Sequence, residues 1–234
     1  MTIENKQEKV LIPKIIHYVW VGGQPLTPLA ERCVASWRQF LPDYELRLWN
    51  EETIPSEVIN HPYVRAMYAK KRWAFVSDYV RFWALAEYGG IYLDTDTEVL
   101  KSLSPLLSSR AFFGQTKDGV TAAGVIGAVS QHPAIKAMLA EYERGVTKDT
   151  VRTSPMIVTE VLATKNFPEV KVFDYRYFNP CDDGERCLPE KLSLAYTKNH
   201  WAESWVPYRR LRKVLRRVGL IGVIRKVKSW LKKN

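Results

Sequence analysis

The stretch that decides the fold is FVSDYVRFWALAEYGGIYLDTDTEVL, residues 75–100. Its first half is apolar and long enough for a helix, which we predict over residues 73–88 and which the pair Gly89-Gly90 would end. A short apolar strand follows directly, and the acidic motif DTD comes next. A long helix joined by two glycines to a buried strand is typical of layered α/β domains.

The acidic motif holds two aspartates, Asp94 and Asp96. Because alternate residues of a strand share a face, we expect both side chains to project together from the strand's carboxyl end. Open α/β sheets bind their ligands at that end. Two adjacent carboxylates repel each other, and Mg²⁺ or Mn²⁺ would compensate their charge through oxygen ligation. Taken alone, the motif is weak evidence for a site, and a solvated acidic turn is the commoner explanation.

Three polar residues, Ser77, Asp78 and Arg81, interrupt the apolar helix. They are three or four positions apart, which makes them neighbours on one helix surface. Charges surrounded by aromatic and aliphatic side chains must be paired or functional. Two interpretations stay open: a structural ion pair between Asp78 and Arg81, or one side of a site that also contains the aspartates of the following strand.

Hydrophobic periodicity predicts further elements on either side of this stretch. We predict strands over residues 15–21, 44–49, 111–114, 125–129 and 170–174, and helices over residues 27–41, 133–143 and 155–164. Alternating strands and helices indicate one α/β domain, residues 1–206, followed by a tail, residues 207–234. His17 lies in the first apolar strand, where a hydrogen-bonded core histidine is a better interpretation than a ligand.

The formal net charge of +10 belongs to the tail. Residues 207–234 contain eleven Lys or Arg and no acidic residue, which leaves 24 basic and 25 acidic residues in the other 206. The apolar residues of the tail step by three and four positions: Leu211, Val214, Leu215, Val218, Ile221, Ile224, Val227 and Leu231. This pattern predicts a basic amphipathic helix that binds an anionic membrane surface.

Two other interpretations of the tail remain. It could pack on the domain with a solvated basic face, or it could bind nucleic acid. We expect no nucleic-acid partner, because the tail lacks the interleaved aromatic residues that single-strand binding uses.

The three cysteines, Cys33, Cys181 and Cys187, give no disulfide framework by count. The polar N-terminus has no apolar stretch like a signal peptide, and no segment is apolar enough to cross a bilayer. We therefore expect a reduced, cytoplasmic protein that lies at the inner face of the cell membrane. A zinc site from Cys181, Cys187 and His200 is disfavoured, because C-x5-C is not a usual zinc spacing.

The motif string S-D-x-x-R…Y-G-G-x-Y-L-D-x-D resembles the DXD-containing glycosyltransferases of family 32, of the bacterial capsule and O-antigen type. It is similar, more distantly, to the glucosyltransferase domains of large clostridial toxins. The phrases IPKIIHYVWVGG, SWRQFLPDYELRLWNEE and HWAESW resemble the same family, so the likeness covers roughly residues 12–206. The resemblance implies a GT-A-type fold, a single nucleotide-sugar-binding domain with a Rossmann-like mixed sheet flanked by helices.

The resemblance also implies a role for each matching residue. Asp94, Asp96 and His200 would bind Mn²⁺ or Mg²⁺. Donor binding would involve Trp20, Asn50, Ser77, Asp78, Arg81, Tyr92, Ser204 and Trp205, with Asp78, Arg81, Asp94 and Asp96 closest to the chemistry. The implied reaction retains the configuration of the sugar carbon. Since no residue is an obvious nucleophile, we favour front-face attack assisted by the departing phosphate.

The implied function moves a hexose or N-acetylhexosamine from a UDP-sugar to a glycan acceptor. A membrane-bound tail would bring the enzyme to acceptors linked to polyprenyl diphosphate, as in bacterial surface polysaccharide synthesis. Two departures from the family pattern leave the donor sugar open: Ala122-Ala123-Gly124 where an Asn is common, and Thr153-Ser154-Pro155 where T-G-P is common.

Two alternatives belong to other classes. A haloacid-dehalogenase-type phosphatase also places D-x-D after a strand and binds Mg²⁺, with Asp182 and Asp183 as later ligands. Against it, Glu98 stands where that motif has Thr or Val. A non-enzymatic membrane adaptor with a degenerate domain is the other alternative, and the intact set of Asp, Arg and His residues disfavours it.

Overall fold

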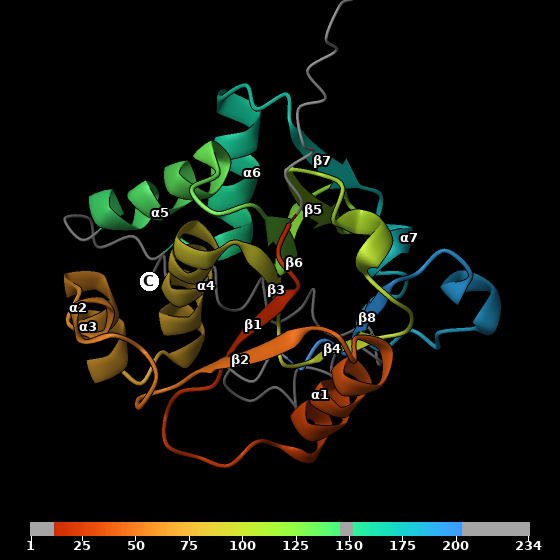
Figure 1. Ribbon diagram of the computed structural model, residues 1–234, viewed down its shortest axis with the longest axis horizontal. Coiled ribbons are helices and arrows are strands. Elements are labelled where there is room, and N and C mark those ends of the chain that lie inside the picture. The colour runs from red at the N-terminus through yellow and green to blue at the C-terminus, as the bar shows by residue number, and fades with distance from the viewer. Residues whose placement is uncertain (1–11, 146–151, 203–234) are drawn as a thin grey trace, which may run out of the picture.

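The computed structural model describes residues 12–145 and 152–202 as a six-stranded mixed sheet with helices on both faces (Figure 1). The strands are β1 (Ile15–Val19), β2 (Glu45–Trp49), β3 (Gly90–Leu93), β4 (Thr97–Val99), β5 (Ala111–Gln115), β6 (Thr121–Ala128), β7 (Val170–Phe173) and β8 (Thr197–Asn199). The α-helices are α1 (Pro28–Phe40), α2 (Ser56–Ile59), α3 (Pro62–Ala69), α4 (Trp73–Tyr88), α5 (Pro133–Gly145), α6 (Ser154–Thr164) and α7 (Tyr175–Phe178). Short 3₁₀ turns cover Ser104–Leu106 and Pro189–Leu192.

The strand order of the main sheet is β2-β1-β3-β6-β5-β7. The first three strands are parallel, with Ile16 opposite Ile91, whereas β6 runs antiparallel to β3 with Val125 opposite Leu93. The carboxyl ends of β1, β2 and β3 therefore meet the beginning of β6 at one edge. A separate antiparallel pair, β4 and β8, lies beyond this edge.

The connection from α4 to β3 is set by two glycines. Gly89 and Gly90 have φ angles of +65° and +104°, a region that side chains disfavour. A Cβ on Gly89 would lie 2.6 Å from the backbone nitrogen of Ser130, and one on Gly90 would lie 2.7 Å from the carbonyl oxygen of Ile15. The helix can thus turn directly into a strand that pairs on both sides, as the sequence predicted.

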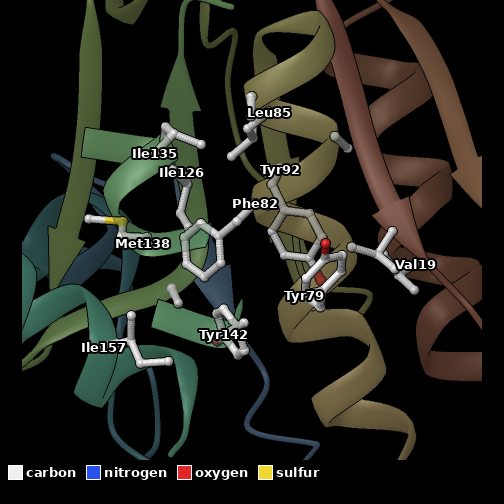
Figure 2. Packing of buried hydrophobic residues seen from close by; sticks show 14 of the residues in the cluster. Val19, Tyr79, Phe82, Leu85, Tyr92, Ile126, Ile135, Met138, Tyr142 and Ile157 are labelled. Carbon is white, nitrogen blue, oxygen red and sulfur yellow. The ribbon is translucent and has the colours of Figure 1, made fainter. Parts of the chain in front are cut away.

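Two hydrophobic clusters cover the two faces of the sheet. One lies under α3, α4, α5 and α6 and includes Phe82, Leu85, Tyr92, Ile126 and Ile157 (Figure 2). The other is centred on Trp37 of α1 and also holds residues of β1, β5 and α7. Burial on both faces explains why β1 and β3 are continuous apolar runs.

His17 is a fully buried core residue, as predicted. Its Nε2–H donates to the carbonyl oxygen of Gly89 at 2.7 Å, and its Nδ1 accepts from the indole N–H of Trp49 at 3.1 Å. The neutral imidazole satisfies both bonds, and a proton on Nδ1 would meet the Trp49 donor. Burial accordingly lowers the pKa of His17 to about 4.

The described elements confirm the predicted α/β class, and the 73–88 helix has the predicted bounds. The pairing of Cys181 with Cys187 in a disulfide was not expected, and it contradicts the prediction of reduced cysteines; only Cys33 is a free, buried thiol. None of the helices in the described segments is long and apolar enough to cross a membrane. The predicted tail, residues 207–234, lies outside the described residues.

Acidification should destabilise the protein partly through His17. Its folded-state pKa lies below the unfolded value, so the unfolded chain takes up this proton first as the pH falls through about 6.5 toward about 4. We expect this residue to remove about 1.4 kcal/mol of stability per pH unit across that window. Urea unfolding from pH 7.5 to pH 5 measures the slope.

The matched variant is His17→Gln, whose amide can still donate and accept but does not titrate. It should be less stable than the wild type at pH 7.5 and lose less stability on acidification. Equal slopes for the two proteins would contradict the assignment.

Candidate functional site

The candidate site lies at the sheet edge where β1, β2 and β3 end. Trp20 follows β1, Asn50 follows β2 and Asp94 follows β3. The antiparallel β6 brings Gly124 to the same place, and its carbonyl oxygen accepts from the N–H of Asp94 at 2.9 Å. Open α/β sheets bind their ligands where parallel strands end in this way.

Asp94 and Asp96 lie in a turn between β3 and β4, not on the strand itself. The N–H of Thr97 donates to the carbonyl oxygen of Asp94 at 2.9 Å, which closes the turn. The alternation argument from the sequence therefore does not apply to this pair. A turn lets each carboxylate contact a different set of neighbours.

Arg81 of α4 connects the helix to the acidic motif. Its Nη2 lies 2.8 Å from Asp78 Oδ1 and 3.3 Å from Asp94 Oδ1, and its Nη1 donates to the carbonyl oxygen of Ala123 at 2.6 Å. The side chain is 6% exposed and stacks over the ring of Tyr92 at 4.4 Å. Burial lowers the pKa of Arg81, but the attraction of Tyr92, Asp94 and Asp78 outweighs it and raises the pKa.

Asp78 is buried, and both of its oxygens are engaged. Oδ1 accepts from the hydroxyl of Ser154 at 2.7 Å, and Oδ2 accepts from the Ser154 backbone N–H at 3.2 Å. The Thr153 cap position makes no side-chain bond to α6, so Asp78 caps this helix from α4. Burial raises the pKa of Asp78, while Arg81 opposes that shift.

The charges on α4 are therefore both a structural ion pair and one side of the candidate site. Asp78 and Arg81 form the structural ion pair, and the same guanidinium reaches Asp94. Both oxygens of Asp78 are therefore engaged within the protein in this structure.

Tyr92 and Ser77 complete the network around Asp94. The Tyr92 hydroxyl donates to Asp94 Oδ1 at 2.9 Å and is 2.9 Å from the Ser77 hydroxyl. Burial raises the pKa of Tyr92 well above its ordinary value, so the phenol stays a neutral donor. Oδ1 of Asp94 is thus held by two groups. A Cβ added to Gly124 would lie 2.8 Å from Asp94 Oδ2 and 3.5 Å from the side-chain nitrogen of Asn199.

Asp96 and His200 lie next to each other through the pairing of β4 with β8. The N–H of His200 donates to the carbonyl oxygen of Asp96 at 2.9 Å, and the Ala202 N–H donates to Asp96 Oδ2 at 2.6 Å. The His200 ring instead hydrogen-bonds Glu98, with Nε2 and Oε2 2.8 Å apart. No three His, Cys, Asp or Glu side chains of residues 12–145 and 152–202 converge as a ready metal site.

The charges of the site still fit a hard divalent cation. Arg81 pairs with both Asp78 and Asp94, and one guanidinium cannot neutralise two carboxylates. Carboxylate oxygens are the ligands that Mn²⁺ and Mg²⁺ prefer. A Cβ on Gly124 would lie 2.8 Å from Asp94 Oδ2, so the glycine keeps space beside that oxygen.

Other predicted donor residues have defined neighbours. The Trp20 indole N–H donates to the Gln24 carbonyl at 2.6 Å, and the ring is partly exposed. The Asn50 side chain accepts from the backbone N–H groups of Glu52 and Thr53, so it orders the turn after β2. Ser204 and Trp205 lie outside the described residues.

Sequence reasoning gave no specific role to four residues that the structure brings to this site. Ser154 binds Asp78, Glu98 binds His200, Gly124 binds the N–H of Asp94, and Asn199 lies close to Gly124. Ser154 and Gly124 fall in the two segments that depart from the family pattern, which was the one available signal. The contacts of Gly124 depend on the pairing of β6 with β3, and those of Glu98 and Asn199 on the pairing of β8 with β4, which no local pattern reveals.

Comparison with known proteins finds a family whose sequence pattern matches part of this chain. Residues 28–113 match the family described as "Glycosyltransferase sugar-binding region containing DXD motif". This part of the chain is therefore similar to the sugar-binding region of DXD glycosyltransferases. The matched region contains Arg81, Asp94 and Asp96 and extends to the middle of β5, so the predicted enzyme class is confirmed.

Two relatives illustrate the range of the glycosyltransferase likeness. "Uncharacterized glycosyltransferase L373" of Acanthamoeba polyphaga mimivirus is 27% identical over 87% of this chain and 88% of its own length. "Inositol phosphoceramide mannosyltransferase 3" of Schizosaccharomyces pombe is 30% identical over 54% of this chain. The match covers 36% of that yeast protein, about a third of its length. These relatives are viral and fungal, so the comparisons support the class without the bacterial capsule subtype.

A solved structure supports the fold. The chain resembles "PaToxG Glycosyltransferase" with a TM-score of 0.53 and 19% identity, over 65% of this chain and 69% of the other. The predicted GT-A-type fold is confirmed at this level.

Gly124→Ala should disturb Asp94 while leaving the fold intact. The added methyl group meets the far end of the Asp94 side chain, which can rotate away, rather than rigid backbone. We expect about 10- to 100-fold weaker Mn²⁺ binding, because a displacement near 1 Å at a site has effects of this size. Titration of free Mn²⁺ by electron paramagnetic resonance measures the affinity.

Gly119→Ala is the matched control. Gly119 has a φ of +81° and its Cβ would meet nothing within 4 Å, so the substitution costs about 1–2 kcal/mol of stability without touching the site. Unchanged Mn²⁺ affinity in Gly124→Ala, or an equal loss in the control, would show that Asp94 does not bind the ion.

Proposed function

We propose that this glycosyltransferase domain transfers a hexose or N-acetylhexosamine from a UDP-sugar, with retention and with Mn²⁺ or Mg²⁺ as cofactor. One observation carries the proposal: Arg81 lies 3.3 Å from Asp94 at the sheet edge where ligands bind. The matched family supports a sugar donor, and its DXD motif supplies these carboxylates. Cleavage of a nucleotide sugar builds negative charge on phosphate, which a positive site stabilises.

Each residue has a task in this proposal. Asp94 and Asp96 would hold the cation, joined by His200 if its ring leaves Glu98. When bound, the cation supplies Lewis-acid stabilisation of the departing diphosphate. Arg81 fixes the Asp94 carboxylate and adds positive charge to the site. Trp20 offers an indole face to the donor base, and Ser77 with Tyr92 orients Asp94.

The other residues assigned to donor binding would act in different ways, some directly and some through their neighbours. Asn50 would act by ordering the loop beside the nucleoside. Asp78 would act through Arg81 and α6. Ser204 and Trp205 would contact the diphosphate.

Retention without a covalent intermediate is consistent with the state of Asp78. Of the nearby carboxylates, it is the one buried beside Arg81, and both its oxygens accept hydrogen bonds from Ser154. Such a carboxylate is not free to attack a sugar carbon. We therefore favour front-face attack, in which the departing phosphate accepts the acceptor's proton.

The acceptor in this proposal is a lipid-linked glycan, such as one carried on polyprenyl diphosphate in bacterial surface polysaccharide synthesis. The name of the yeast relative describes transfer of mannose to an inositol phosphoceramide, which is also a phosphate-bearing membrane lipid. A membrane-bound tail would place the enzyme at the inner, cytoplasmic face of the membrane. Because the yeast relative is a mannosyltransferase by name, mannose belongs among the donors to be tested.

The phosphatase alternative finds no support in the geometry. Asp182, one of the two residues suggested as later ligands, makes an ion pair with Lys117, and Glu98 bonds His200. The adaptor alternative is disfavoured by the network of bonds that holds Asp94. A panel of UDP- and GDP-linked sugars, assayed for Mn²⁺-dependent hydrolysis, tests all three functions. Phosphatase activity without nucleotide-sugar turnover would overturn the proposal.

Asp94→Asn and Asp96→Asn should each lower kcat/KM at least about 100-fold, since a site loses several kcal/mol when a charge-stabilising group is removed. Asp43→Asn is the control, because Asp43 is an exposed aspartate paired with Lys14. Progress curves with the preferred donor measure the loss. Full activity in both site variants would refute a metal role for the motif.

Deleting residues 207–234 should abolish binding to anionic vesicles, because eleven basic residues contribute about 1 kcal/mol each near such a surface. Co-sedimentation with phosphatidylserine vesicles, compared with neutral vesicles, measures the change. Soluble-donor hydrolysis should be retained. An unchanged vesicle partition after the deletion would rule out the tail as the anchor.

A further inference from the structure

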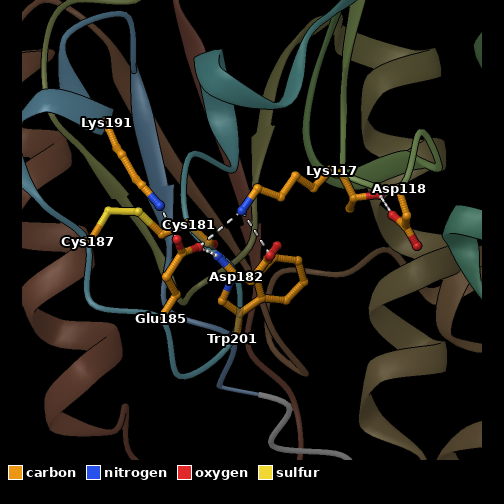
Figure 3. Close-up of polar contacts among 9 residues, drawn as sticks. Lys117, Asp118, Cys181, Asp182, Glu185, Cys187, Lys191 and Trp201 are labelled. Carbon is orange, nitrogen blue, oxygen red and sulfur yellow. Dashed lines mark hydrogen bonds and ion pairs between the residues drawn. A yellow bond between two sulfur atoms is a disulfide. The ribbon is translucent and has the colours of Figure 1, made fainter.

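A disulfide-closed loop lies beside the end of β8. Cys181 and Cys187 are joined with their Cα atoms 5.6 Å apart. Lys117, from the turn between β5 and β6, pairs with Asp182 and Glu185 of the loop, and Lys191 pairs with Glu185 (Figure 3). The bond to Lys191 lowers the pKa of Glu185 to about 2. The loop is thus tied both to itself and to the neighbouring hairpin.

Trp201 is attached to this loop. Its indole N–H donates to the carbonyl oxygen of Cys181 at 2.8 Å, and the ring lies next to the loop in Figure 3. The backbone of Trp201 has a φ of +50°, a left-handed conformation that a tryptophan rarely adopts. Its own N–H donates to Asn199 Oδ1 at 2.6 Å. Surrounding contacts must hold such a residue in place.

The two residues flanking Trp201 both bind Asp96. His200 donates its N–H to the Asp96 carbonyl at 2.9 Å, and Ala202 donates its N–H to Asp96 Oδ2 at 2.6 Å. The left-handed turn at Trp201 directs these two amides to one residue. Loss of that turn would release the Asp96 carboxylate from its backbone donor.

We propose that Trp201 is a positioning residue for Asp96, and that the Cys181–Cys187 loop is the anchor that keeps Trp201 in place. The hydrogen bond from the Trp201 indole to Cys181 fixes Trp201 against the loop. This fixes the next amide, that of Ala202, which donates to the Asp96 carboxylate. The structural part of this proposal stands without the proposed function, whereas its effect on metal binding rests on it. Reduction of the disulfide to two thiols, with dithiothreitol oxidised to its cyclic disulfide, should therefore loosen Asp96.

Hydrogen exchange of the full chain, without metal, tests the structural part. We expect the amides of His200 and Ala202 to exchange at least about tenfold faster in Trp201→Phe, which keeps a ring but removes the N–H donor. The same change is expected after reduction and in Cys181→Ser/Cys187→Ser. Trp83→Phe is the matched control, since Trp83 contacts the aromatic rings of Trp49 and Tyr88 and lies on α4.

Exchange at His200 and Ala202 that is unchanged in Trp201→Phe, or equally faster in the control, would overturn the proposal. The second readout is Mn²⁺ affinity by electron paramagnetic resonance, which a purely structural role of Trp201 would not move. We expect affinity to fall about tenfold in Trp201→Phe, with a thermal midpoint close to that of the control. Faster exchange with unchanged Mn²⁺ affinity would refute the positioning role.

The two proposals fail in different ways. A wild type without nucleotide-sugar turnover would refute the proposed function, but the exchange of these two amides would still test whether Trp201 holds the backbone around Asp96. If turnover is present, Trp201→Phe should reduce kcat more than it changes KM for the donor, because the proposal assigns Trp201 to Asp96 and not to the donor. A change confined to KM would contradict its assignment to Asp96.

Discussion

The buried guanidinium of Arg81 is the interaction on which the site depends. It lies between Asp78 on its own helix and Asp94 on the following turn, and it also bonds the backbone of Ala123 on β6. A buried charge is tolerated only when partners surround it. The turn at Gly89-Gly90 joins α4 to β3 and so brings Asp94 within reach of Arg81. The Arg81 guanidinium therefore holds α4, the turn after β3 and β6 together. The short connection from α4 to β3 keeps Asp94 within its reach.

Much of the fold was predictable because its signals are local. The apolar helix at 73–88, the glycine pair and the buried strands carry patterns that depend only on neighbouring residues. The short elements were not predicted: α2, α3, α7 and the pair of β4 with β8. These elements have between three and eight residues, which gives too little periodicity to detect. The Cys181–Cys187 disulfide was missed for a related reason, since a count of three cysteines says nothing about which two meet.

The site was predictable in membership but not in arrangement. Sequence motifs identified Asp78, Arg81 and Asp94, which the structure joins in one network. The position of His200 relative to Glu98 depends on the register of an antiparallel pair that spans a hundred residues of chain. Likewise, Asp78 was expected at the donor, and its capture by Ser154 became visible only once α6 was placed against α4. The residue types of the site could be recognised in the sequence, but the pairing of segments far apart in the chain could not.

The capping of α6 by Asp78 has a consequence for protein engineering. This helix begins without a cap of its own, so its first turn is completed by a residue 76 positions earlier in the chain. A chimera that imported α6 from a relative would have to bring a hydroxyl at position 154 or else remove one hydrogen bond from the buried Asp78 carboxylate. The junction for domain recombination therefore belongs after this helix, where the chain enters β7, and not in the loop that precedes it.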